Sequence, residues 1–247
     1  MPFYVPPESP EDRLFVFEET TRFVAAEQTA GRAAPIKAAT LAGVTAFTAV
    51  FKPRVAALTG TLGTRAREVE EATTAKATLE EAVRDYLEVL KRRTRRKRHN
   101  IAVLVNHGLP ASGDIPALGS WAELKQVATA LIVGDALSAP AYGAMQNPSA
   151  ADLQAALTAA QDEHEDVAPA DSAVQAAQSA LAAQAETAAF WVSEIRYDAL
   201  DTARRADDAS QRRLLRRLGY RFKTLPGEPP EDPTDQLNPA PTPPPTP

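Results

Sequence analysis

The chain has 247 residues and a net charge of −5, the balance of 27 basic and 32 acidic residues. A hydrophobic share of 44% and a charged share of 24% are ordinary for a globular protein, and the small negative charge excludes a global field that would attract nucleic acid. The chain contains no cysteine, which excludes disulfides, thiolate metal sites and cysteine nucleophiles.

The N-terminal residues predict an extended lead followed by a helix. Residues 1–8 carry several prolines and no helical pattern. Ser9 is a good N-cap, and Pro10 at the first helical position loses no hydrogen bond, because that N–H has no partner inside a helix. We therefore expect a helix that begins after Ser9 and ends at Gly31.

A second helix is predicted to open at Pro35. Pro53 lacks a backbone donor and is expected to kink or break this helix. Gly60 and Gly63 follow, and we interpret them as a break before the next helix. The apolar stretch 36–51 is too short and too mixed to span a membrane.

A long helix over residues 65–105 is the centre of the prediction. Its heptad positions are mostly apolar, as in a helix that packs on partner helices; they are Val69, Ala72, Lys76, Leu79, Val83, Tyr86 and Leu90. Seven cations in eight residues follow, which we call the basic segment: Lys91, Arg92, Arg93, Arg95, Arg96, Lys97 and Arg98. With about 3.6 residues per turn, cations this dense surround the helix, so one or two must point toward the partners of its apolar stripe.

The second half of the chain predicts further helices. Ser120 matches a capping box and begins a short helix that Gly134 is expected to stop. Another helix is predicted from about residue 149 to residue 166, and Pro169 is expected to separate it from a last long helix over 171–218. The next residues, Tyr220, Arg221 and Phe222, are expected to fold back onto the end of the bundle.

The fold class follows from this pattern. Aromatic residues make up only 6% of the chain, and alanine, leucine and valine dominate the apolar share, which favours helices. We predict an all-α protein: an elongated bundle of about six helices, two of them long, over a single domain at 9–223. Residues 224–247 contain ten prolines and predict a disordered tail.

The basic segment is the strongest candidate site. Without its seven cations, 20 basic residues face 32 acidic ones, a net charge of −12. Clustered arginines can bind phosphates, anionic lipids or an acidic protein surface. The alternative is a solvated or internally neutralised helix, for which the acidic run 162–166 is the obvious partner.

A second basic cluster lies near the C-terminus. Its cations are interleaved with leucines and aromatic residues, and they are Arg212, Arg213, Arg216, Arg217, Arg221 and Lys223. Cations at the C-terminus of a helix are favoured by its dipole, which is a sufficient structural explanation. Nucleic-acid binding gains weight only if the fold brings this cluster beside the basic segment.

Neither a cofactor nor a metal is expected. In the run 162–166, His164 and its neighbouring carboxylates point to different sides of a helix, so they cannot converge on one ion without partners from elsewhere. No histidine has the Glu-x-x-His spacing of di-iron bundles, and the chain has no phosphate loop or nucleophile elbow. We therefore do not expect an enzyme.

The sequence favours a non-enzymatic structural or interaction protein. We expect it to be a homo-oligomer or to bind a protein partner, and to dock an acidic partner through the basic segment. The alternative is a nucleic-acid-binding protein that uses residues 91–98 and 212–223. A membrane-active bundle is a third, weaker hypothesis. No signal peptide or transmembrane segment is visible, which predicts a cytoplasmic protein.

Overall fold

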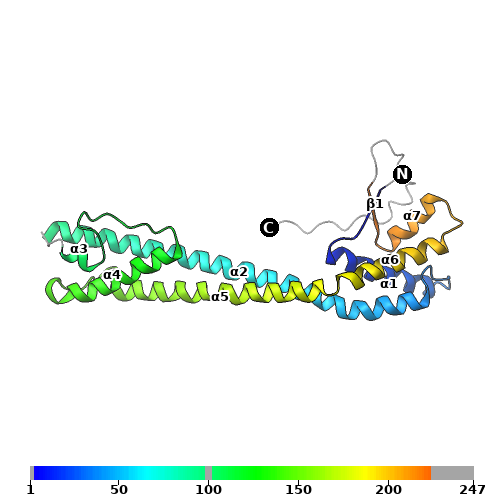
Figure 1. Cartoon of the computed structure of the whole chain (residues 1–247), viewed down its shortest axis with the longest axis horizontal. Coiled ribbons are helices and arrows are strands. Elements are labelled where there is room, and N and C mark those ends of the chain that lie inside the picture. The colour runs from blue at the N-terminus through cyan, green and yellow to red at the C-terminus, as the bar shows by residue number, and fades with distance from the viewer. Residues whose placement is uncertain (1–2, 98–101, 224–247) are drawn as a thin grey trace. The chain divides into compact units, whose positions relative to one another are not determined.

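The computed structural model describes residues 3–97 and 102–223. Over these residues the fold is all-α, as predicted, with seven helices and one small antiparallel sheet (Figure 1). The elements in chain order are β1 (Phe3–Val5), α1 (Pro10–Thr29), α2 (Ala38–Lys97), α3 (Ala102–Asn106), α4 (Trp121–Tyr142), α5 (Ala150–Ala182), α6 (Ala185–Thr202), α7 (Asp208–Arg217) and β2 (Arg221–Lys223). The predicted tail at 224–247 lies outside the described residues.

The chain divides into two compact units. Unit 1 consists of residues 1–59 together with 176–247, and unit 2 consists of residues 60–175. The prediction of one domain over 9–223 stays a prediction. Both α2 and α5 contribute residues to each unit, so the two units are described separately below.

Three predicted helix starts, after Ser9, Ser120 and Ser149, are confirmed, and each rests on a local contact. The Ser9 side chain accepts a hydrogen bond from the Asp12 N–H at 3.0 Å, with Pro10 at the first helical position. At α4, Ser120 and Glu123 form the complete capping box. At α5, the Ser149 hydroxyl accepts from the Asp152 N–H at 3.1 Å. Caps of this kind satisfy backbone donors that a helix start leaves free.

The predicted breaks in the first long helix are wrong. α2 continues from Ala38 through Pro53, Gly60 and Gly63 to Lys97. A proline inside a helix costs about 3 kcal/mol and a glycine about 1 kcal/mol. Packing offsets the proline, since Phe51 and Val55 on either side of it are buried.

The predicted stops in the second half are wrong in the same way. Gly134 lies inside α4, which ends at Tyr142 with Gly143 as its C-cap. Pro169 lies inside α5. The predicted last helix over 171–218 is divided among the end of α5, α6 and α7.

Unit 1 has a core with aromatic residues at its centre. The ring of Phe17 on α1 packs edge-on against Phe47 and Phe51 of α2, with centroids 5.7 and 5.9 Å away. Tyr220 is buried and donates to the Val192 carbonyl of α6. The C-terminal residues therefore fold back as predicted, and β2 pairs antiparallel with β1.

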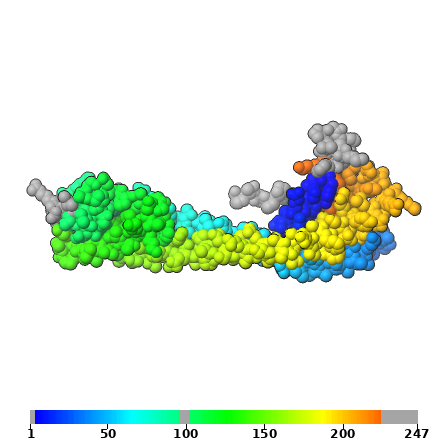
Figure 2. Space-filling model, viewed as in Figure 1, coloured from blue at the N-terminus to red at the C-terminus, as the bar shows by residue number. Residues whose placement is uncertain are grey.

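Unit 2 has its own core, formed by α2, α3, α4 and α5. Buried residues of α2 continue the predicted heptad from Leu79 onward, whereas Val69 is exposed. α5 runs antiparallel to α2, because Arg65 contacts Asp171 while Glu68 and Glu71 lie beside Glu163. Figure 2 shows that the yellow-green part of α5 and the cyan part of α2 are uncovered on the face drawn.

Candidate functional site

The basic segment forms the last two turns of α2. Arg92 and Arg95 are exposed, whereas Lys91 and Arg93 are half-buried. Only the backbone is described for Arg96 and Lys97, and Arg98 lies outside the described residues. The prediction that some of these cations turn toward the helix partners is thus met by Arg93.

Arg93 binds the C-terminal end of α4. Its guanidinium donates to the carbonyls of Gly143 at 2.7 Å and Ala144 at 3.0 Å, and also to that of Tyr142. These carbonyls follow the last turn of α4, where the helix dipole favours a cation. Arg93 therefore has a structural role that its chemically identical neighbours Arg92 and Arg95 do not share.

A buried polar cluster lies beneath Arg93. It contains Tyr86 of α2, His107 after α3 and Asp135 of α4, and the rings of Tyr86 and His107 lie 6.1 Å apart. The His107 Nδ1 atom lies 2.7 Å from the Val103 carbonyl, and the Asp135 carboxylate accepts the Met145 N–H at 2.9 Å. These three buried side chains thus bring α2, the end of α3 and α4 together at one place.

Burial shifts the pKa of two side chains of this cluster, His107 and Tyr86. It lowers the pKa of His107, so the neutral imidazole is favoured. Burial, followed by the Asp135 carboxylate, raises the pKa of the Tyr86 phenol. Within the described part of the chain, the Tyr86 hydroxyl and the His107 Nε2 atom have no hydrogen-bond partner. Perturbed groups of this kind are a usual mark of a functional site.

The space beside the cluster is too small for a substrate. The cavity lined by Arg93, His107 and Asp135 has a volume of about 10 Å³, close to that of one water molecule. Gly134 allows the tight packing, since a Cβ atom there would lie 2.4 Å from the Cα of His107. The arrangement fits a structural junction of α2, α3 and α4. The sequence analysis did not predict this junction, although Gly134 within an apolar helical stretch was a visible signal for it.

The acidic run 162–166 lies far from the basic segment. Carboxylate oxygens of Glu163, Glu68 and Glu71 all lie within 4.8 Å of one another. Since Glu71 precedes Arg92 by 21 positions on one helix, the two are on the order of 30 Å apart. The suggestion that Glu163 and its neighbours neutralise the basic segment internally is therefore wrong.

The three carboxylates do not by themselves form a metal site. Arg67 contacts Glu68 at 2.8 Å and Glu71 at 3.9 Å, so a cation of the chain already neutralises part of their charge. The neighbouring His164 points elsewhere and lies against Trp121, with ring centroids 4.8 Å apart. Glu68 and Glu71 of α2 do lie beside Glu163. The sequence alone could not reveal this tertiary contact.

The C-terminal basic cluster belongs to α7 and β2 in unit 1. Its leucines pack, as Leu215 and Leu218 are buried. Its cations contact unit 1: Arg213 donates to Ser210, Arg216 and Arg217 lie over the rings of Phe222 and Phe23, and Arg221 pairs with Asp12 at 3.0 Å. Arg212 also has a partner. The basic segment belongs to unit 2, so among the described residues neither unit holds a combined basic patch.

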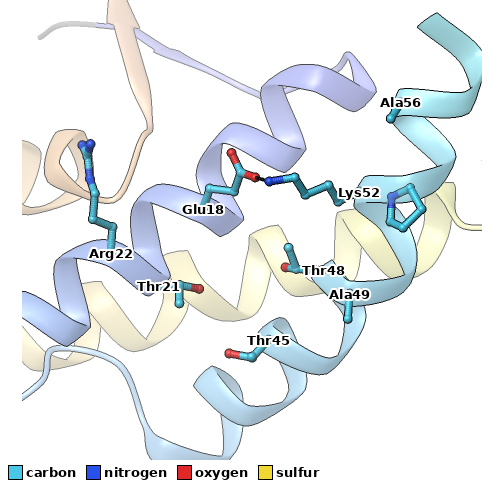
Figure 3. A pocket seen from close by; sticks show the side chains of 9 residues that line it. Glu18, Thr21, Arg22, Thr45, Thr48, Ala49, Lys52 and Ala56 are labelled. Carbon is cyan, nitrogen blue, oxygen red and sulfur yellow. Dashed lines mark hydrogen bonds and ion pairs between the residues drawn. The ribbon is translucent and has the colours of Figure 1, made fainter. Parts of the chain in front are cut away.

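Unit 1 carries a shallow groove between α1 and α2, with a volume of about 730 Å³ (Figure 3). Its α2 side consists mainly of small residues, which are Thr45, Thr48, Ala49, Pro53 and Ala56. At its rim, Glu18 and Lys52 form an ion pair at 2.7 Å. Because its charged rim residues are already paired, the groove suits contact with an apolar surface better than chemistry.

The same part of α2 is weakly hydrophobic. An 18-residue window within Ala38–Arg95 has a mean hydropathy of 1.3, and 17% of it is buried. By length and composition alone such a helix could cross a membrane. The expectation that no segment spans a membrane was based on the short apolar stretch 36–51, and it stays a prediction.

Comparison with known proteins adds no relative. No family model matches the sequence, and neither a curated protein nor a solved structure matches it.

Proposed function

We propose that the protein is a non-enzymatic helical interaction protein that docks an acidic partner through its basic segment. One observation carries the proposal: Arg92 and Arg95 are exposed at the end of α2, while Arg93 between them is bound to α4. Without the basic segment the chain has a net charge of −12. Guanidinium groups pair with carboxylates through two parallel hydrogen bonds. Exposed arginines on an otherwise acidic protein therefore suit an acidic partner.

The groove in unit 1 and the weakly hydrophobic stretch of α2 support a role in contact with other molecules. The cavity beside the cluster below Arg93 has a volume of about 10 Å³ and admits no substrate, so we do not propose this cluster as a catalytic site. Both observations agree with a protein whose surfaces, and not a pocket, carry its function.

The test separates docking arginines from the structural one. The variant Arg92→Gln/Arg95→Gln keeps Arg93, so α4 remains held, and the matched control Arg204→Gln/Arg205→Gln changes two exposed arginines of unit 1. Binding of a labelled poly-glutamate peptide is measured by fluorescence anisotropy. With ~0.2–1 kcal/mol per exposed ion pair, the double variant should bind roughly two- to thirtyfold more weakly, and the control should be unchanged.

Two results would contradict this function. Equal weakening in the variant and the control would mean that only net charge matters. A duplex DNA of equal charge that binds far more tightly than the peptide, with an affinity that falls steeply as salt rises, would favour nucleic-acid binding instead.

A further inference from the structure

Unit 2 carries opposite charges at two separate places. The first is the exposed part of the basic segment, with Arg92 and Arg95. The second, which we call the acidic patch, lies where α2 and α5 run side by side and consists of Glu68, Glu70, Glu71, Asp162, Glu163, Glu165 and Asp166. Glu68 and Glu163 are half-buried, and the other five side chains are exposed.

The two places cannot neutralise each other within one unit. Residues 71 and 92 lie on the same helix, and at about 1.5 Å per residue they are on the order of 30 Å apart. At an ionic strength of about 0.1 M, charges interact over about 10 Å, so a separation of this size screens them. Each place therefore keeps its charge available to another molecule.

The acidic patch is suited to receive a cation. Three of its carboxylates converge within 4.8 Å, and Arg67 is the cation of unit 2 that contacts two of them. Like charges this close repel each other, and a guanidinium placed beside them relieves the repulsion. The patch thus has the chemistry that the proposed function requires of the partner of Arg92 and Arg95.

We propose that the acidic partner is a second copy of this chain, with the basic segment of each copy docked on the acidic patch of the other. This inference rests on the proposed function and names its partner. The two copies lie antiparallel about a two-fold axis near the middle of the α2 residues 71–92.

The geometry allows both contacts to form at once. The separation between basic segment and acidic patch is the same in both copies, so an antiparallel arrangement that matches one contact also matches the other, as an isologous interface requires. The face extends about 40 Å along α2 and is two helix diameters, roughly 20 Å, wide. Its area is therefore about 800 Å² per copy. That is the area that a standard stable interface buries on each partner, about 800 Å².

Charge exchange between copies provides the test. One variant, Arg92→Glu/Arg95→Glu, reverses the basic segment, and a second, Asp162→Arg/Asp166→Arg, reverses one exposed side of the acidic patch. All four positions are exposed and helical, so each variant should keep the circular dichroism spectrum of the wild type. The matched control is Arg204→Glu/Arg205→Glu in unit 1.

Sedimentation velocity on the full chain, on the order of 100 µM, measures assembly. We expect a dimer at about 0.1 M salt that dissociates at about 1 M salt. Each reversal should weaken dimerisation at least about tenfold, because like charges then face each other. An equimolar mixture of the two variants should restore a dimer with one copy of each, and the control should dimerise as the wild type does.

Three results would overturn the inference: a wild type that is monomeric at low salt, a dimer that survives both high salt and both reversals, or a mixture that stays monomeric. The poly-glutamate assay then shows what else has failed. A monomer that still binds the peptide through Arg92 and Arg95 removes the second copy as partner and leaves the proposed function standing. A monomer that does not bind it contradicts both.

Discussion

Replacing Gly134 by alanine tests the close junction of α3 and α4. By helix propensity alone, Gly134→Ala should stabilise α4 by about 1 kcal/mol. However, the new Cβ atom would lie 2.4 Å from the Cα of His107 and 2.6 Å from the carbonyl oxygen of Asn106. Both are backbone atoms and cannot rotate away, and overpacking of this kind costs about 1–3 kcal/mol or more. We therefore expect a net loss of stability of up to about 2 kcal/mol.

The matched control is Gly63→Ala in α2 of the same unit. Apart from its chain neighbours and the backbone of its own helix, no described atom lies within 4 Å of a Cβ at this position, so only the propensity gain of about 1 kcal/mol remains. The same chemical change should thus have opposite signs at the two sites. Urea unfolding followed by circular dichroism measures the difference, and hydrogen exchange of α3 and α4 localises it. If Gly134→Ala is as stabilising as Gly63→Ala, the close approach of α3 and α4 is wrong.

Three further predictions concern single side chains. Arg93→Met removes the donor to the end of α4 and should lower stability by about 1–3 kcal/mol in thermal melts, whereas Arg92→Gln should change it by less than about 0.5 kcal/mol. Burial lowers the pKa of His107, so the folded state binds fewer protons than the unfolded state. The free energy of unfolding should therefore fall as the pH drops below about 6.5. His107→Gln should abolish this part of the pH dependence, as measured by urea unfolding at about pH 7.5 and about pH 5.5. Burial alone would raise the pKa of Asp198, but hydrogen bonds from Lys37 and Thr40 outweigh burial and lower the pKa. Asp198→Asn should therefore lower stability by about 1–2 kcal/mol in thermal melts at neutral pH. This loss should shrink as the pH falls from about 3.9, the unfolded pKa, through the lower pKa of the folded state.

Local contacts explain which features the sequence could predict. The caps at Ser9, Ser120 and Ser149 involve residues three positions apart, so their pattern is visible in the chain itself. The predicted apolar spacing starts at Val69, and from Leu79 onward it corresponds to the buried side of α2. These features allowed the all-α class to be predicted before any tertiary contact was known.

Tertiary contacts explain what the sequence could not show. Pro53 and Pro169 are local stop signals, but they are outweighed where neighbours such as Phe51 and Ala170 are buried against other helices. The role of Arg93 depends on the end of α4, about fifty residues further along the chain. In a run of seven cations, nothing in the sequence distinguishes this arginine from Arg92, because its partners are backbone carbonyls that any residue could offer.

The order of the two units along the chain has a consequence for synthesis. Unit 2 is inserted between the two parts of unit 1, and β1 pairs with β2 across more than 200 residues. Unit 2 can close its core as soon as residue 175 has emerged from the ribosome, while α1 and the first part of α2 still wait for α6, α7 and β2. At about 5–20 residues per second, the remaining residues up to 223 take several seconds to appear. During that interval the aromatic core around Phe17 is incomplete, which makes unit 1 the part of the chain with the greater need of protection from aggregation.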